Sequence, residues 1–478
     1  MQIKNFYYIL GLEKRNFYFF AENWGGNLEK EKFYFVVRKL ILPLLTGSQL
    51  VGEEESNARE AEVALGKQNS LLIKPCKTAE YRLVIKRGRA YQPFEINLLK
   101  NILKEINDVS NFEGLDPSYE MGLLEKAIEK AVCDSVASSA SSTMLGLVGA
   151  LSNWSARTYE GKKINFGIIL NITDNNEVGP LHYSDMLSSD FFALLSDGKH
   201  SFVEFNKDGY LTGYVSLAKV RNYSSIAPYE FNYVARYCGE KKVGIALTEN
   251  GDLLIFKNHT LMYAKRRGKW NVYSHEEIIQ LLSYRTSHSL KEIRRAIYLS
   301  AIDCSFNYSG GIIVYLKRDM AEGALAHIDA RDILSERYYE IKKRIELEES
   351  EKLYNLSSAE RTRSFYSPNY EEFMVKNSCY KSECLKQIID GRKFHEIDRK
   401  LREEIIAMDG ATIIDFDGTI IAAGAILKIE AGSLGGGRLA AAKDLAKYGV
   451  SLKISQDGVI QGFSTDKKNS SKVLFTVS

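Results

Sequence analysis

The chain has 478 residues, more than a single hydrophobic core usually serves, so two or three domains are expected. With 45% apolar residues, 26% charged residues and only 7 prolines, its composition is that of an ordinary soluble globular protein. The net charge of +3, from 64 basic and 61 acidic residues, is too balanced for a protein that coats nucleic acid. Nucleic acid is therefore not indicated as a partner.

The six cysteines are scattered without CxxC spacing, which fits neither a disulfide framework nor a zinc site and indicates a cytoplasmic protein. The closest pair, Cys379 and Cys384, has no matched Cys/His pair nearby to complete a metal site. The N-terminus lacks the uninterrupted apolar stretch of a secretory signal. Residues 131–151 are interrupted by Asp134 and several serines, so they predict a buried helix and no membrane contact.

Residues 1–155 are expected to form an N-terminal α+β region. The apolar spacing of PFEINLLKNILKEIND predicts a helix, and residues 117–151 have a helical pattern throughout. Aromatic and β-branched runs predict strands at Phe6–Leu10, Phe17–Phe20, Phe33–Val37, Ser70–Ile73 and Tyr81–Ile85.

Residues 156–280 are expected to form a β-rich meander domain, because short apolar runs alternate there with turn residues. Asn250-Gly251 predicts a hairpin with a type I′ turn, since both residues accept the positive φ values that this turn requires. Lys257-Asn258-His259 predicts the next hairpin. The basic run Lys265–Trp270 leaves two possibilities open, a solvated turn or a patch that holds phosphate or nucleic acid.

Residues 281–478 are expected to form a C-terminal α/β domain with a mixed central sheet flanked by helices. Leu290–Ile302 predicts an amphipathic helix, Gly310–Leu316 predicts a buried strand, and a charged helical insertion follows at about 318–395. The whole chain is thus predicted to be an α+β multidomain protein, in which a β-rich, sensor-like region precedes the C-terminal domain.

The segment Met408–Phe463 has the strongest chemical signal. A strand that ends in an acidic turn, Thr412–Gly418, is followed by a second strand, and the loop Gly435-Gly436-Gly437 then opens the Ala-rich helix Arg438–Lys447. This arrangement offers a carboxylate for a cation and backbone N–H groups for phosphate. It predicts nucleotide chemistry.

Two enzyme motifs compete for these residues. The run Asp415-Phe416-Asp417-Gly418-Thr419 resembles the nucleophile motif of haloacid-dehalogenase-type phosphatases, in which one Asp attacks phosphorus and the second acts as acid and base. Too few residues follow it for the remainder of that fold, so this match is weak.

The second match covers residues 397–465 in order and spacing. Asp409-Gly410-Ala411 after a helix, the hairpin I-I-D-x-D-G-x-I, a glycine-rich turn with Arg, an A-x-x-L-A-K helix and I-S-x-x-G together resemble the diadenylate cyclase (DisA N-terminal) domain family. Leu290–Ile302 and Gly310–Leu316 resemble the first helix and strand of that domain. Residues 1–280 are not covered.

The resemblance implies a nucleotidyltransferase that condenses two ATP molecules into cyclic di-AMP, or a related cyclic dinucleotide second messenger, with Mg²⁺ or Mn²⁺. It assigns Asp409 to catalysis and to the metal ion. The phosphate-binding motif of the family, Gly-Thr-Arg-His-Arg, aligns with Gly436–Ala440. The implied nucleotide and phosphate contacts are Gly410, Ala411, Gly435, Gly436, Gly437, Arg438 and Ser455, and Lys443 is a further candidate one helical turn after Arg438.

The chain departs from the family in the phosphate motif, where Leu439 and Ala440 replace the His and the second Arg. Losing these two side chains weakens stabilisation of the transition state. The expected cost is comparable to that of losing one oxyanion-hole donor, ~2.7–4 kcal/mol. Lys443 substitutes in part if it faces the same way as Arg438. Two hypotheses therefore stand, an active cyclase regulated by its N-terminal region, or a degenerate domain that binds ATP or a dinucleotide without turnover. Family cyclases place two sites face to face, so the resemblance implies a homo-oligomer.

Overall fold

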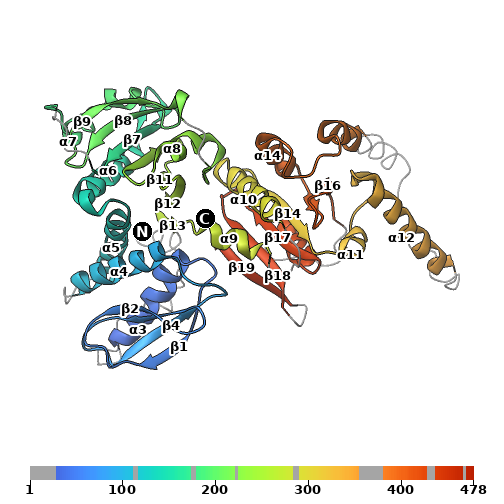
Figure 1. Ribbon diagram of the computed structural model, residues 1–478, viewed down its shortest axis with the longest axis horizontal. Helices are drawn as coiled ribbons and strands as arrows, with labels where there is room; N and C mark the ends of the chain where they lie inside the picture. Colours follow the sequence, from blue (N-terminus) through green and yellow to red (C-terminus); the bar gives the residue numbers. More distant parts are fainter. Residues whose placement is uncertain are drawn as a thin grey trace, which may run out of the picture. The chain divides into compact units, whose positions relative to one another are not determined.

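The computed structural model describes residues 28–110, 117–173, 179–220, 224–283, 290–354, 380–427, 436–466 and 470–477. The protein is a mixed α/β multidomain chain (Figure 1). Its contacts divide it into two compact units, residues 1–114 and 115–478. The predicted domain boundaries near residues 155 and 280 both fall inside the second unit and remain predictions. Gly435 and the predicted strands Phe6–Leu10 and Phe17–Phe20 lie outside the described residues.

The first unit contains an antiparallel sheet with the strand order β1-β4-β3-β2. Two of its strands confirm the predictions at Ser70–Ile73 and Tyr81–Ile85. The predicted helix PFEINLLKNILKEIND is also confirmed, as α4 (Pro93–Ser110). Arg87 forms a fully buried ion pair with Glu95 in the first turn of α4, with N–O distances of 2.6 and 2.8 Å. The four strands are β1 (Gln49–Glu55), β2 (Glu62–Leu65), β3 (Ser70–Lys74) and β4 (Tyr81–Lys86).

The strand predicted at Phe33–Val37 is wrong, because these residues are helical. They belong to α3 (Leu28–Val36) and to the π-helical turn Val37–Ile41. The buried side chains are Phe33, Val36, Val37 and Ile41. This spacing of three, four and eight residues is the stripe of a helix, whereas a half-buried strand would bury alternate positions.

The second unit begins with the helices α5 (Pro117–Ala137) and α6 (Ser141–Trp154), which confirm the helical prediction for residues 117–151. A short 3-10 turn, Ser138–Ala140, separates them. Val132 and Leu147 are fully buried, as expected for a core segment. None of the helices in the described ranges is both long and apolar enough to span a bilayer.

A seven-stranded sheet follows, with the strand order β13-β12-β11-β10-β7-β8-β9. The last four strands in sequence form an antiparallel meander, as predicted, while β7 and β8 pair in parallel. The strands are β7 (Phe166–Asn171), β8 (Ser201–Asn206), β9 (Leu211–Ser216), β10 (Lys242–Leu247), β11 (Leu253–Lys257), β12 (Thr260–Arg266) and β13 (Lys269–Val272). The helices α7 (Tyr183–Met186), α8 (Asn232–Tyr237) and α9 (His275–Leu281) accompany this sheet.

The turns of the meander correct one prediction. Asn258 and His259 join β11 to β12 with φ angles of 51° and 61°, which is the type I′ geometry. The hairpin at Asn250-Gly251 exists, but only Gly251 has a positive φ, at 80°, and Leu247 pairs with Leu253 across a longer loop. The type I′ turn predicted there is therefore wrong.

The C-terminal part of the second unit is built on a six-stranded mixed sheet in the order β16-β15-β14-β17-β18-β19. Only β14 and β15 pair in parallel, and the other neighbours are antiparallel. The strands are β14 (Gly311–Leu316), β15 (Ala411–Ile414), β16 (Ile420–Ala425), β17 (Gly449–Ile454), β18 (Ile460–Thr465) and β19 (Ser471–Val477). This is the predicted mixed sheet, with β19 as an additional strand at its edge.

Helices cover both faces of this sheet, so its central strand β14 is buried along its whole length. Ile313 and Tyr315 belong to an apolar cluster with α10 (Lys291–Phe306) and α14 (Arg399–Ala407). Ile312 and Val314 point the other way, into a cluster with the remaining helices. Those helices are α11 (Ala321–Leu325), α12 (Glu336–Tyr354) and α15 (Gly437–Leu445).

The first of these clusters also joins the two sheets of the second unit. It contains Phe256 of the seven-stranded sheet, Ile278 of α9, Ile297 of α10 and Ile313 of β14. Polar contacts follow the same route, because Asp303 on α10 accepts two 2.7 Å hydrogen bonds from Arg399 on α14 and one from the backbone N–H of Tyr229. The two sheets therefore share one continuous core.

Candidate functional site

The strand directions bring the predicted site residues to one end of the six-stranded sheet, the edge at which β14 and β15 begin and β17 ends. Because β14 and β15 are parallel, Ile312 pairs with Ala411 and both strands begin at this edge. Because β17 is antiparallel to β14, its last residue, Ile454, pairs with Gly311. The loops before β14 and β15 and the turn after β17 are therefore neighbours.

Arg438 and Asp409 meet at this edge, with 3.9 Å between Arg438 Nη2 and Asp409 Oδ1. The side chain of Arg438 is 35% exposed and that of Asp409 is 88% exposed, so both can reach a ligand in solvent. The guanidinium lies over Gly310, where a Cβ atom would be 2.3 Å from Arg438 Nη1 and 3.3 Å from Gln456 Cγ. Gly310 thus provides the space in which Arg438 lies beside Gln456.

Gly410 has a packing role that the sequence did not reveal. Its φ is +113°, and a Cβ atom there would lie 2.5 Å from the carbonyl carbon of Gly424 and 2.7 Å from the nitrogen of Ala425. Gly424 also has a positive φ, and a Cβ on it would lie 3.2 Å from the carbonyl oxygen of Asp409. Two glycines therefore let the loop that carries Asp409 pack directly on the backbone of β16.

Helix α15 begins at a glycine of the predicted phosphate loop. Gly436 is the N-cap residue with φ +85°, which glycine accepts readily. Gly437 is exposed, so the first turn of α15 is open to solvent. This end of the helix dipole attracts anions and lies beside Arg438.

The other predicted site residues differ in whether they reach this edge. Lys443 is exposed in the last turn of α15, and five residues at about 100° each place it about 140° around the helix from Arg438. Ala411 is fully buried within β15. Ser455 follows β17, and its backbone closes a turn with Gly458 and Val459. Of the predicted set, Asp409, Gly410, Gly436, Gly437, Arg438 and Ser455 thus lie at one edge.

Two contributors to this edge could not be assigned from the motif alone. Gln456 lies beside Arg438, as described above. Lys381 donates hydrogen bonds to Asp332, at 2.6 Å, and to the carbonyl of Gly424, at 2.9 Å, so it fixes the part of β16 on which Gly410 packs. Lys381 comes from the charged insertion, where nothing in the sequence marks it among many lysines.

The Asp415–Thr419 turn lies at the opposite end of β15. Asp415 is 2% exposed, burial raises the pKa of its carboxyl group, and the hydroxyl of Tyr338 donates a hydrogen bond to it. Burial also opposes ionisation of Asp417, but hydrogen bonds from Lys393 and Thr419 outweigh it and hold the Asp417 pKa below its usual range. A phosphatase nucleophile has to be open to substrate, so the geometry does not support the dehalogenase-type interpretation.

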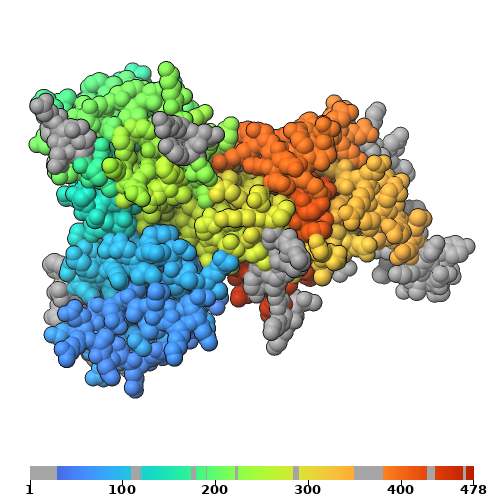
Figure 2. Space-filling view, in the orientation of Figure 1, coloured from blue at the N-terminus to red at the C-terminus, as the bar shows by residue number. Residues whose placement is uncertain are grey.

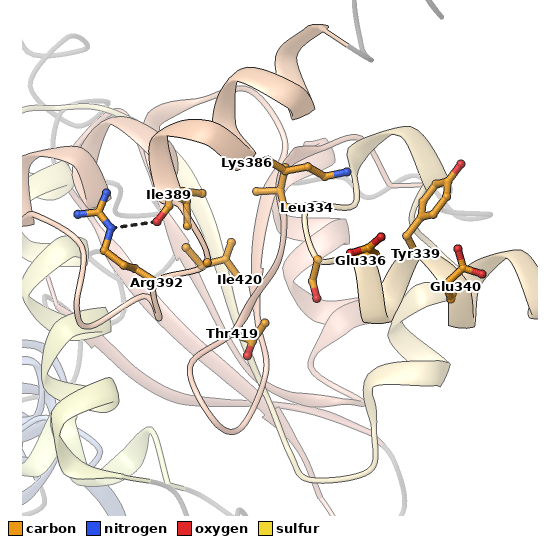
Figure 3. A pocket seen from close by; sticks show the side chains of 11 residues that line it. Leu334, Glu336, Tyr339, Glu340, Lys386, Ile389, Arg392, Thr419 and Ile420 are labelled. Atoms are coloured by element: carbon orange, nitrogen blue, oxygen red, sulfur yellow. Dashed lines mark hydrogen bonds between the residues drawn. The ribbon is translucent and has the colours of Figure 1, made fainter.

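A cavity of about 610 Å³ lies next to this turn, between α12, the helical residues 380–389 and the start of β16. In Figure 2, α12 and residues 380–427 lie side by side on one face of the molecule. Figure 3 shows Tyr339 and Glu340 of α12 on one side of the cavity and Ile389 and Arg392 on the other. The Arg392 side chain is hydrogen-bonded to its own segment there, because its Nε donates to the carbonyl of Ile389 at 3.0 Å. The cavity belongs to the end of β15 away from Asp409.

In the described part of the chain, no three or more His, Cys, Asp and Glu side chains are grouped as metal ligands. The donor set at the site is one carboxylate, Asp409, with the amide of Gln456 beside Arg438. Such a set suits Mg²⁺, which proteins often hold with one or two carboxylates together with substrate phosphates.

Comparisons of the chain with protein-family models, with curated proteins and with solved structures find no match in any of the three. The functional assignment rests on the site.

Proposed function

We propose that the C-terminal part of this protein is a nucleotide-binding domain of the diadenylate cyclase type, which binds the phosphates of ATP or of a cyclic dinucleotide. The observation that supports it best is the meeting of Asp409 with Arg438, which lies in the first turn of α15, at one sheet edge. A guanidinium at a helix N-terminus, where the helix dipole favours negative charge, forms a site for phosphate oxygens.

Mg²⁺ or Mn²⁺ belongs to this proposal as a companion of the nucleotide. Asp409 is the residue that would hold the ion, and the phosphates would supply most of the remaining ligands. The ion would neutralise phosphate charge next to Arg438, which is the single arginine of the degenerate motif.

Binding without turnover fits the donor set better than catalysis does. Cyclase chemistry has to neutralise two triphosphates and a departing pyrophosphate, which normally requires several cations. Arg438 is the one basic residue that the aligned motif contributes at this edge, and Lys443 lies on another face of α15. The sensor-like alternative is therefore the leading proposal.

Cyclase activity is the second candidate, and the 88% exposure of the Asp409 side chain favours it. A carboxylate so open to solvent, beside an arginine, is available to a metal ion and to an attacking hydroxyl group. If the protein is active, two copies are needed to align two ATP molecules, and the specific activity rises with protein concentration.

The deciding experiment measures binding of ATP and of cyclic di-AMP to the full-length protein by calorimetry and thermal shift. Arg438→Gln is expected to weaken binding about tenfold or more, as loss of a charge-assisted pair implies. Lys472→Gln is the matched control, because Lys472 pairs with Ser464 at the far end of β18. Equal binding by both variants, or no binding by the wild type, would contradict the proposal.

Labelled ATP separates the two candidates. The full-length protein and Asp409→Asn are incubated with ATP and Mg²⁺ or Mn²⁺, and products are resolved by chromatography. A dinucleotide formed by the wild type and lost in Asp409→Asn establishes the cyclase. Retained nucleotide binding without product, with either metal, establishes the binding protein.

A further inference from the structure

We propose that the β12–β13 hairpin of the seven-stranded sheet positions the β17–β18 turn, which forms one wall of the candidate nucleotide site. Arg266 is the positioning residue. The inference rests on the proposed function for its effect on nucleotide affinity, whereas its structural part can be measured without nucleotide.

Arg266 is the last residue of β12, and its side chain extends toward the C-terminal sheet, where it is only 4% exposed. Its Nε pairs with Asp252 at 3.1 Å. Its Nη1 donates to the hydroxyl of Ser305 at 2.9 Å and to the carbonyl of Gly458 at 3.3 Å, and its Nη2 donates to the carbonyl of Ser305 at 3.0 Å. The guanidinium therefore connects β12 to the end of α10 and to the β17–β18 turn.

The turn is shaped around this guanidinium. Gly458 has φ +82°, and a Cβ atom there would lie 2.2 Å from Arg266 Nη2, so any other residue would displace the arginine. The hydroxyl of Ser305 also donates to the carbonyl of Gly458. The neighbouring Arg267, at the tip of the hairpin, pairs with Asp457 at 3.5 Å. Two successive hairpin residues thus hold two successive turn residues.

The same turn contains two residues of the candidate site. Ser455 accepts a hydrogen bond from the N–H of Gly458 and donates its own N–H to the carbonyl of Val459, so the turn is one hydrogen-bonded unit. Gln456 lies within it and shares the space over Gly310 with Arg438. Because the turn is short and internally bonded, a shift at Gly458 is transmitted to Gln456 and to the surroundings of Arg438.

The chemistry of arginine explains why this position needs it. The guanidinium presents five donors in a fixed plane, and here it bonds to three different residues at once. A lysine carries its three donor hydrogens on one nitrogen, whereas Asp252, Ser305 and Gly458 are held here by three separate nitrogens of the guanidinium. The hairpin is thus able to set the position of the turn, so any event that moves the seven-stranded sheet alters the site.

The test uses four variants of the full-length protein and a fifth as a control. Arg266→Lys removes the fork and retains the charge. The exposed pair is changed by three variants, which are Arg267→Glu, Asp457→Arg and the double exchange. The two side chains are 61% and 46% exposed, so these three variants should fold even if Arg266→Lys does not. Lys269→Glu is the matched control, because Lys269 is exposed on the same hairpin.

The first measurement is hydrogen exchange at residues 455–459 without nucleotide, together with phenylglyoxal modification of Arg438. Faster exchange in the turn and a changed modification rate are expected for Arg266→Lys and for each single exchange variant, with recovery in the double exchange. Wild-type exchange and reactivity in all variants would overturn the positioning role, whether or not the protein binds nucleotide.

The second measurement is ATP affinity. Arg266→Lys is expected to weaken binding about threefold to tenfold, within the range reported for residues that couple to a site without touching the ligand. Unchanged affinity in a folded Arg266→Lys variant, when Arg438→Gln loses binding, would overturn the inference and leave the proposed function intact. Absence of ATP binding by the wild type would instead count against the proposed function alone.

Discussion

His275 is a buried histidine at the start of helix α9. One ring nitrogen contacts the hydroxyl of Tyr298 at 2.9 Å and the other contacts the carbonyl of Leu261 at 2.6 Å. Burial lowers its pKa from 6.5 to about 4, and the neighbouring carbonyl only partly offsets this. The native state therefore holds a neutral imidazole between the start of α9, α10 and β12.

We expect stability to fall as the pH falls from about 6.5 to about 4. In this window the unfolded chain takes up a proton at residue 275 that the native state refuses, so acid favours unfolding by about 3 kcal/mol in total. Urea unfolding of the wild type and of His275→Gln across this range measures the effect. The variant should lose much of the pH dependence, and an unchanged slope would show that other groups cause it.

At the scale of elements, the contact between the Asp409 loop and strand β16 makes the clearest prediction. Gly410→Ala places a Cβ atom 2.5 Å from backbone atoms of Gly424 at a φ of +113°, and backbone cannot yield as a side-chain tip does. We expect a loss of at least about 1–3 kcal/mol of unfolding free energy, or a displaced loop with weakened ATP binding.

Gly149→Ala in α6 is the control for that substitution. A Cβ atom on Gly149 meets nothing within 4 Å, so alanine should stabilise the protein by up to about 1 kcal/mol through its helix propensity. Thermal unfolding of both variants gives the comparison. Similar effects of the two substitutions would contradict the backbone clash at Gly410.

Elements were predictable where a single period dominates. The fully apolar run of β14 and the amphipathic α10 follow from pattern alone, and so do the strands and the helix that form the candidate site. The strand prediction at Phe33–Val37 is wrong because the aromatic residues there favour a strand locally, whereas the helical spacing of the buried side chains decides the structure. At Asn250-Gly251 the residue types favour a type I′ turn, but the strand register makes the loop longer and overrides them.

The candidate site was predictable as a set of segments but not as a geometry. Asp409 and Arg438 follow from their motif. The contribution of Gly310 depends on where the arginine lies, and that of Lys381 depends on how a distant helix packs on β16. Arg266 was one of several basic residues in a turn, and its burial depends on the opposite sheet. These contacts join segments that are far apart in the chain, so no local pattern contains them.

At the scale of the whole second unit, the shared core predicts cooperative unfolding. Arg399→Met leaves the buried carboxylate of Asp303 without its partner, which should cost about 3–5 kcal/mol. Because one apolar cluster spans both sheets, hydrogen exchange should accelerate in β10 as well as in β14. Exchange that accelerates only in the C-terminal sheet would show that the two sheets unfold separately.

Arg344→Met is the control for this experiment. Arg344 is exposed on α12, so its replacement should change the unfolding free energy by less than about 0.5 kcal/mol. A large effect of the control would indicate that loss of an arginine, and not the buried carboxylate, causes the destabilisation.

The central position of β14 has a consequence for how the chain folds. Its partners come much later in the sequence, since Ile312 pairs with Ala411 and Gly311 with Ile454. Contacts between such distant segments form slowly, because a long loop has to close before pairing stabilises it. During synthesis this wholly apolar strand leaves the ribosome long before either neighbour exists, and in that interval the new chain depends most on protection from aggregation.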